Sequence, residues 1–169
     1  PHPPIAEDVG EDFLDVLTTE MAAYHRRFAD DRGRYRPALR EWVETGESRA
    51  VTGERFADAL WRRLHIASGW SDWLDEHRLD AILEPTIPLV APLRGDGYDH
   101  AGSDIAMISL THLWDWTGFP AVALPSEVGR ATGLPVSVSL IGRDGADSDL
   151  LDVGEDLQAA LGVPAWPDL

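Results

Sequence analysis

In the first half of the chain, apolar residues recur every three or four positions, which is the spacing of one helix face. The first such run predicts a helix from 8 to about 30, with an apolar face made of Phe13, Leu14, Leu17, Met21, Tyr24 and Phe28. A charged segment at 30–34 ends that pattern. A short helix is then predicted over 37–45, with Pro37 in its first turn and Gly46 just past its end. A longer helix opens at Thr52 and continues to about 74.

From residue 79 the period changes, and the pattern favours strands and buried helix. Residues 79–83 form a short apolar run that predicts a buried strand. Three prolines between 85 and 92 then predict extended chain, and glycine and aspartate at 95–102 predict a surface loop. Ser103 is a suitable N-cap for a helix over 104–116 that ends near Gly118. This helix is apolar nearly all round, so we expect it to be buried.

The last third of the chain predicts two strands and a terminal helix. Residues 121–124 are an apolar run closed by Pro125, and residues 136–141 alternate apolar and hydroxyl side chains. The two strands are expected to form a long hairpin or to lie side by side. Asp147 or Ser148 is expected to cap a final helix that continues to about 161.

Charge and composition exclude several functional classes. The chain has 30 acidic and 14 basic residues, a net charge of −16, and no basic stripe that would follow a nucleic-acid backbone. No apolar stretch approaches the roughly 20 residues of a membrane span, and an anionic membrane surface would repel the chain. We therefore expect a cytoplasmic protein that binds neither nucleic acid nor membrane. With no cysteine and no lysine, the chain supplies no disulfide, no thiol nucleophile and no lysine base.

Three segments in the second half of the chain together resemble the amidase-signature family. The first, 79–88, matches an aspartate, an apolar run and a Pro-Thr-x-Pro block. The second is the Thr-Gly-Phe-Pro-Ala of 117–121, followed by Pro125. The third starts at the Gly-Leu-Pro-Val of 133–136 and continues through 140–143 to the leucine pair at 150–151. Their order and spacing over roughly 75 residues make a chance match a poor explanation.

The sequence departs from the family pattern at three places. Asp115 stands where the family usually has asparagine, and Ser126 stands where a glycine is common. Residues 137–139 are Ser-Val-Ser, where Gly-x-Gln is common. These changes do not alter the fold that the resemblance implies. They mean that the details of substrate binding in the family do not carry over directly to this chain.

The resemblance implies an α/β fold: part of a mixed β-sheet flanked by helices, as in the amidase-signature fold. Residues 1–169 would be the C-terminal portion of such a domain, with 1–78 mostly helical and 79–169 carrying strands, helices and the family motifs. Family members hydrolyse carboxamides through a serine acyl-enzyme, with a second serine and a lysine as activators. Those residues lie in a glycine- and serine-rich signature upstream of the matched segments. The resemblance therefore implies no catalytic residue in this chain, no cofactor, and a missing N-terminal catalytic portion as partner.

The resemblance also suggests where a small amide substrate would be bound. The stretch after Pro85 comes near the acyl side of the site in the family, so Thr86, Ile87 and Leu89 are candidate substrate-binding residues. Trp114 and Trp116, beside the Thr-Gly-x-Pro turn, are further candidates, although plain core packing explains a tryptophan equally well.

The sequence offers no convincing metal site. His112 and Asp115 are three residues apart on a predicted helix, but such a pair supplies only two ligands. The aspartates at 144, 147, 149 and 152 do not have the EF-hand spacing. They are better explained as the negatively charged start of a helix.

Two other functions stay open from the sequence. One is a non-catalytic, acidic binding module that kept the fold and lost the chemistry. The other is an amidase-type subunit of a tRNA-linked amidotransferase, against which the net charge of −16 argues. The sequence also leaves a homodimer open.

Overall fold

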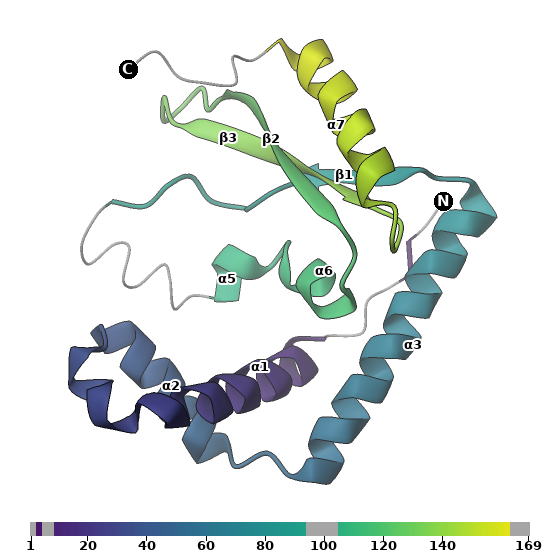
Figure 1. The fold of residues 1–169 in the computed structure, drawn as a ribbon. Coiled ribbons are helices and arrows are strands. Elements are labelled where there is room, and N and C mark those ends of the chain that lie inside the picture. Colours follow the sequence, from purple (N-terminus) through teal and green to yellow (C-terminus); the bar gives the residue numbers. More distant parts are fainter. Residues whose placement is uncertain (1–2, 5–8, 94–104, 163–169) are drawn as a thin grey trace. The chain divides into compact units, whose positions relative to one another are not determined.

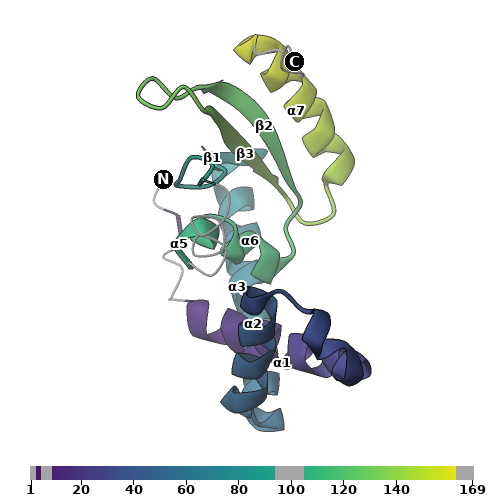
Figure 2. The same ribbon diagram turned by 90° about the vertical axis from the view of Figure 1, so that its left-hand side faces the viewer.

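The computed structural model describes residues 3–4, 9–93 and 105–162 and divides into two compact units. One unit is Ile5–Ile66, and the other is Pro1–Pro4 with Ala67–Leu169. Helix α3 (Gly53–His77) belongs in part to each unit, and both views show it as one long continuous helix (Figure 1 and Figure 2). The units are described separately below.

The first unit is helical. It contains α1 (Gly10–His25), the 3-10 helix η1 (Arg26–Arg34), α2 (Pro37–Arg49) and the first part of α3. The prediction of one α-helix to about residue 30 is wrong, because the chain changes to a 3-10 helix at Arg26, with non-helical angles at Phe28. None of the residues of η1 is buried, so no packed face holds this segment in regular α-helical form.

Gly46 lies inside α2 and does not end it, contrary to the prediction. A Cβ atom at this position would collide with the backbone oxygen of Thr18 in α1. The glycine therefore allows the backbones of α1 and α2 to approach closely. The helix ends at Arg49, where Ala50 adopts the left-handed conformation with φ 47°.

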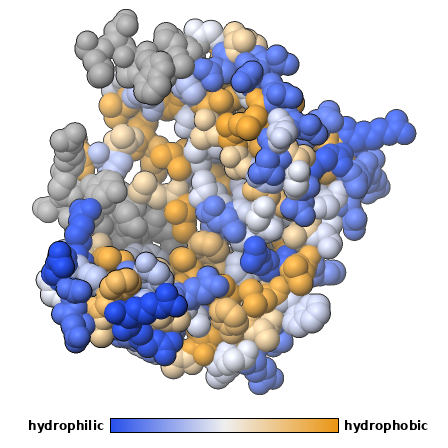
Figure 3. Space-filling model, viewed as in Figure 1, coloured by the Kyte–Doolittle hydropathy of each residue, from blue (hydrophilic) through white to orange (hydrophobic). Residues whose placement is uncertain are grey.

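The apolar face predicted for α1 is only partly buried, with Phe13, Leu14, Leu17 and Met21 half-buried. The buried residues of this helix are Asp12, Asp15, Val16, Thr18 and Ala22. Tyr24, by contrast, is 55% exposed, and Phe28 beyond the helix is 41% exposed. Apolar side chains are visible at the molecular surface among polar ones (Figure 3). The contact between α1 and α2 is thus made where Gly46 meets Thr18, because the small glycine lets the two backbones approach closely.

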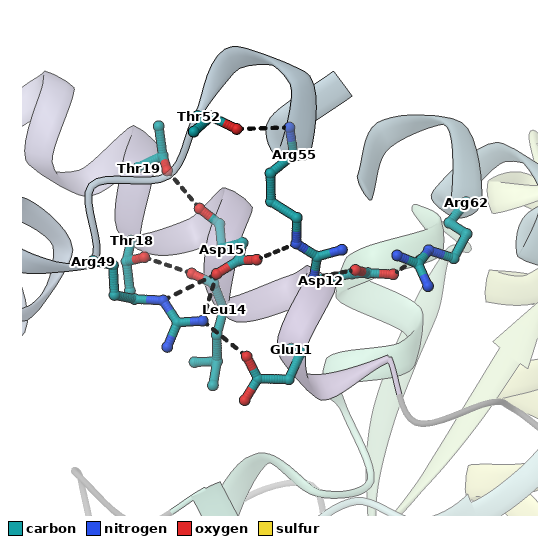
Figure 4. A network of polar contacts seen from close by, with 10 residues as sticks. All are labelled: Glu11, Asp12, Leu14, Asp15, Thr18, Thr19, Arg49, Thr52, Arg55 and Arg62. Atoms are coloured by element: carbon teal, nitrogen blue, oxygen red, sulfur yellow. Dashed lines mark hydrogen bonds and ion pairs between the residues drawn. The ribbon is translucent and has the colours of Figure 1, made fainter. Parts of the chain in front are cut away.

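Two buried carboxylates link α1 to the helices that follow it (Figure 4). Asp15 forms ion pairs with Arg49 of α2 and Arg55 of α3. Asp12 pairs with Arg55 and with Arg62, at 2.6 and 2.9 Å. The predicted start of α3 is confirmed, since the backbone N–H of Arg55 donates to the hydroxyl of Thr52 at 3.1 Å.

The second unit contains a three-stranded antiparallel sheet in the order β1-β3-β2. The strands are β1 (Ala81–Pro85), β2 (Ala121–Val128) and β3 (Pro135–Gly142), and β2 and β3 form the predicted hairpin. The predicted end of β2 at Pro125 is wrong: the strand continues through a register irregularity between Pro125 and Glu127. Proline is tolerated there because β2 is an edge strand of the described sheet.

Helix α7 (Asp147–Leu161) covers one face of this sheet (Figure 1). Leu150 packs with Leu124 and Leu140, and four partly buried residues surround them, namely Ala81, Val122, Val138 and Leu157. The predicted end of α7 is confirmed. The predicted cap is wrong, because Ala146 occupies the N-cap position and no side chain bonds there. Helices packed on a sheet confirm the predicted fold class; the described strands pair antiparallel.

Two short helices, α5 (Ile105–Ile108) and α6 (His112–Thr117), replace the single helix predicted over 104–116. The interruption has a local cause. The side chains of Thr111 and His112 contact the carbonyl oxygen of Ile108, at 3.4 and 3.0 Å, and compete with regular helical bonding. The predicted end is confirmed by Gly118, whose φ is 83°. The predicted loop at 95–102 and cap at Ser103 lie outside the described residues.

Candidate substrate-binding site

The sheet face opposite α7 carries a group of polar side chains. In β1, Glu84 points to the same face as Ile82, and Thr86 continues that alternation. The register pairs Glu84 with Ser139 of β3, which places Ser139 on this face too. The hydroxyl of Ser139, a residue only 5% exposed, donates to the Thr86 hydroxyl at 2.9 Å. The backbone N–H of Thr86 donates to the Ser137 carbonyl at 3.1 Å.

Trp114 of α6 reaches the same face and contacts Glu84. Its indole N–H donates to Oε1 of Glu84 at 2.5 Å. The indole is buried, with an edge-on contact to Trp70 at a centroid distance of 5.0 Å and a stacked contact to Phe119 at 6.0 Å. These aromatic neighbours restrict the indole ring and therefore fix the direction of its N–H.

Glu84 lies in an environment that disfavours its charge. Burial raises the pKa of this carboxyl above its ordinary value, and the hydrogen bond from Trp114 opposes that effect only in part. Within the described residues, no arginine forms an ion pair with Glu84. The face thus combines a hydroxyl pair, a half-buried carboxyl and an indole donor.

Arg143 holds the end of β3 against the entry to β1. Its guanidinium donates to the carbonyl oxygen of Leu79 at 2.8 and 3.0 Å and to that of Leu74 at 3.2 Å, and it pairs with Asp75. These carbonyls lie at the end of α3 and just after it, where a cation interacts favourably with unpaired C=O groups. Arg143 thereby fixes the start of the strand that carries Glu84.

The structure brings together some of the predicted substrate-binding residues. Thr86 and Trp114 both lie at one sheet face, where Trp114 is bonded to Glu84 and Thr86 to Ser139. Ile87 and Leu89 follow β1 in extended chain, with Ile87 half-buried and Leu89 47% exposed. Trp116 is 3% exposed and belongs to the buried part of α6.

Sequence reasoning missed Glu84 and Ser139. Each lies two positions from another polar residue of the same segment, Glu84 from Thr86 and Ser139 from Ser137. This period of two was the available signal, because it places the polar side chains of both strands on a common face. The hydrogen bond between Thr86 and Ser139, however, spans 53 positions, so the contact between the two strands is not visible in either segment alone.

Neither hydroxyl of this site is arranged as an activated nucleophile. Among the described residues, Ser139 and Thr86 are hydrogen-bonded to each other and to no carboxylate or imidazole. The arrangement can bind a polar group by hydrogen bonds, but no base is hydrogen-bonded to either hydroxyl to remove its proton.

Among the described residues, no three His, Cys, Asp or Glu side chains are grouped so that they could hold a metal ion. The His112 ring nitrogen Nδ1 lies 3.0 Å from the Ile108 carbonyl, and Asp115 is exposed. In the same part of the chain, no helix has the length and apolar character to cross a membrane.

Comparison with known proteins identifies the family of this chain. The sequence model of the family called Amidase matches residues 19–151. The chain therefore belongs to the amidase family.

Individual relatives agree with that assignment. Amidase 1 of Oryza sativa subsp. japonica is 31% identical over 91% of this chain. A mitochondrial glutamyl-tRNA(Gln) amidotransferase subunit of Mycosarcoma maydis is 34% identical over 72% of it. A crystal structure of an amidase superposes on 92% of the chain with a TM-score of 0.76 and 29% identity.

The match covers only part of each relative. This chain spans 38% of the rice protein, 23% of the Mycosarcoma protein and 36% of the amidase of known structure. These matches therefore establish the family of this chain, and the activity of the protein to which it belongs is proposed below.

Proposed function

We propose that this chain is the C-terminal, substrate-side part of an amide hydrolase that acts on carboxamides through a serine acyl-enzyme. The catalytic serines and lysine would lie upstream of Pro1. One observation carries the proposal: β1, β3 and α6 bring hydroxyl, carboxyl and indole groups together at one sheet face, in a chain without lysine.

In this proposal the upstream portion catalyses the reaction and this chain positions the substrate. A serine hydroxyl attacks an amide only when a base accepts its proton, and the resulting oxyanion needs fixed donors. The upstream portion would supply both. The sheet face of this chain would hold the rest of the substrate, since a bound substrate must be positioned to react.

A second candidate is a subunit of a tRNA-linked amidotransferase. The 34% identity with the Mycosarcoma amidotransferase protein favours it. The net charge of −16 argues against contact between this chain and a tRNA backbone. We therefore rank it below the hydrolase.

The proposed partners are a small amide substrate and the N-terminal catalytic portion, with no cofactor and a cytoplasmic location. A homodimer is compatible with the proposal and adds nothing to the chemistry.

Amide hydrolysis tests the proposed function. The protein that includes the upstream portion should release ammonia from simple aryl and aliphatic amides, and residues 1–169 alone should release none. Glutamine hydrolysis that depends on an aminoacyl-tRNA acceptor would favour the amidotransferase. Turnover by residues 1–169 alone that survives repurification would show that the catalytic residues do not lie in the upstream portion. A complete protein without any turnover would favour the binding module.

A further inference from the structure

Glu84 differs from the buried carboxylates of the first unit. Asp12 and Asp15 each form ion pairs with two arginines. Glu84 is hydrogen-bonded by one neutral donor, the indole of Trp114, and among the described residues no cation pairs with it. Carboxylates removed from water are normally paired with a cation, so this half-buried one is electrostatically incomplete.

We propose that Glu84 is a specificity-determining residue that binds an ammonium group on the amide substrate. This inference rests on the proposed hydrolase function and names a substrate class for it: amides that carry a positively charged amine away from the scissile bond.

The carboxylate of Glu84 has acceptor positions that Trp114 does not fill. An ionised carboxylate can accept about four hydrogen bonds, and Trp114 supplies one of them, to Oε1. Trp70 and Phe119 restrict the Trp114 ring, so the carboxylate is held in a defined orientation. An ammonium group has three donors and could complete the remaining acceptor positions.

The surroundings of Glu84 suit a cation better than an anion. The hydroxyls of Thr86 and Ser139 lie on the same sheet face and have oxygen lone pairs for an ammonium donor. Burial raises the pKa of Glu84, and a cation bound beside it would reverse that effect by favouring the charged form. The ligand would thus supply the charge that the described residues lack.

The experiment compares two amides of equal length on the complete protein: 5-aminopentanamide, which carries an ammonium, and hexanamide, which carries a methyl group in its place. We expect kcat/KM to favour the cationic amide by roughly 10- to 100-fold, as for a hydrogen bond between charged groups. Glu84→Gln should reduce this ratio to near one. Glu84→Asp, which keeps the charge, should retain part of the preference.

The ratio separates recognition from folding, because a loss of folded protein lowers both rates equally. Glu127→Gln is the matched control, since Glu127 is an exposed carboxylate of β2 in the same sheet, and it should leave the ratio unchanged. A wild-type ratio near one, or a preference that persists in Glu84→Gln, would overturn the inference while leaving the hydrolase intact. The absence of turnover with any amide would overturn the proposed function, and this inference with it.

Discussion

Asp15 shows how a single buried carboxyl can organise three helices of one unit. Burial would raise its pKa, but hydrogen bonds and charges from Arg49 and Arg55 outweigh that effect, and the pKa is lowered. Both arginines come from later helices, Arg49 from α2 and Arg55 from α3. The folded state therefore favours the ionised form of Asp15 more than the unfolded chain does.

Asp15→Asn should weaken the first unit by about 2–3 kcal/mol. Removing one partner of a buried pair costs about 3–5 kcal/mol, and the partial exposure of the two arginines reduces that figure. Because the folded pKa is lowered, the stabilisation is present above the ordinary value of 3.8 and is lost as the pH falls through the folded pKa. Hydrogen exchange of α1 and α2 amides at several pH values measures the difference.

The exposed Asp58 of α3 provides the control for this substitution. Asp58→Asn removes the same charge without a buried partner and should change amide protection by less than about 0.5 kcal/mol. Equal effects of the two substitutions would show that the ion pairs of Asp15 contribute nothing beyond net charge.

At the scale of the elements, two helical glycines have opposite roles. A Cβ at Gly46 of α2 would collide with the Thr18 backbone oxygen, whereas one at Gly69 of α3 would have nothing within 4 Å. Gly46→Ala should therefore force α1 and α2 apart and cost about 1–3 kcal/mol. Gly69→Ala should stabilise the helix by up to about 1 kcal/mol, because alanine loses less conformational entropy.

Thermal unfolding of the two variants checks this pair of predictions. The melting temperature should fall for Gly46→Ala and rise for Gly69→Ala relative to the wild type. A rise for both would mean that the α1–α2 contact relaxes at little cost, and that helix propensity alone decides the outcome.

The sequence predicts the elements better than their contacts. The starts of α2 and α3 and the ends of α6 and α7 follow from local signals, namely Pro37, Thr52, Gly118 and the end of apolar periodicity. The close approach at Gly46 could not be predicted, because a glycine near a helix end has the same local pattern whether it ends the helix or permits packing. The break between α5 and α6 depends on side-chain bonds to Ile108 that periodicity does not reveal.

The candidate site was predictable only in part, for a related reason. Family motifs pointed to Thr86 and Trp114, which lie at the sheet face that carries Glu84. The burial of Ser139 and the indole contact of Glu84 depend on pairing between distant segments. The local period of two shows which side chains share a face, but it does not show which distant strand pairs with that face.

At the scale of the whole molecule, the described part of the chain has edge strands and exposed apolar side chains. Within the described residues, β1 and β2 are edge strands with a partner on one side only. Several large apolar side chains are exposed, among them Trp61 at 72%, Leu64 at 59% and Leu83 at 58%. Unpaired strand edges and exposed apolar groups favour association between molecules.

We therefore expect residues 1–169 produced alone to be marginally stable or to aggregate, and co-expression with the upstream portion to give a soluble complex. Burying one large apolar side chain contributes about 1.5–3 kcal/mol, which is substantial against a total stability of roughly 5–15 kcal/mol. Size-exclusion chromatography with light scattering, combined with thermal unfolding, measures both properties. A monodisperse monomer with a cooperative, high melting transition would contradict this expectation and favour the binding module.

The β1-β3-β2 strand order has a consequence for the way the second unit folds. The β2–β3 hairpin closes locally, through the backbone bonds of Gly129 with Gly133 and Leu134. Strand β1 must wait for a partner far along the chain: Leu79 at its entry is bonded to Arg143, which lies 64 positions further on. Closing so long a loop is entropically costly and slow. During synthesis, the strand that carries Glu84 emerges first and has no partner in the described sheet until β3 has been made.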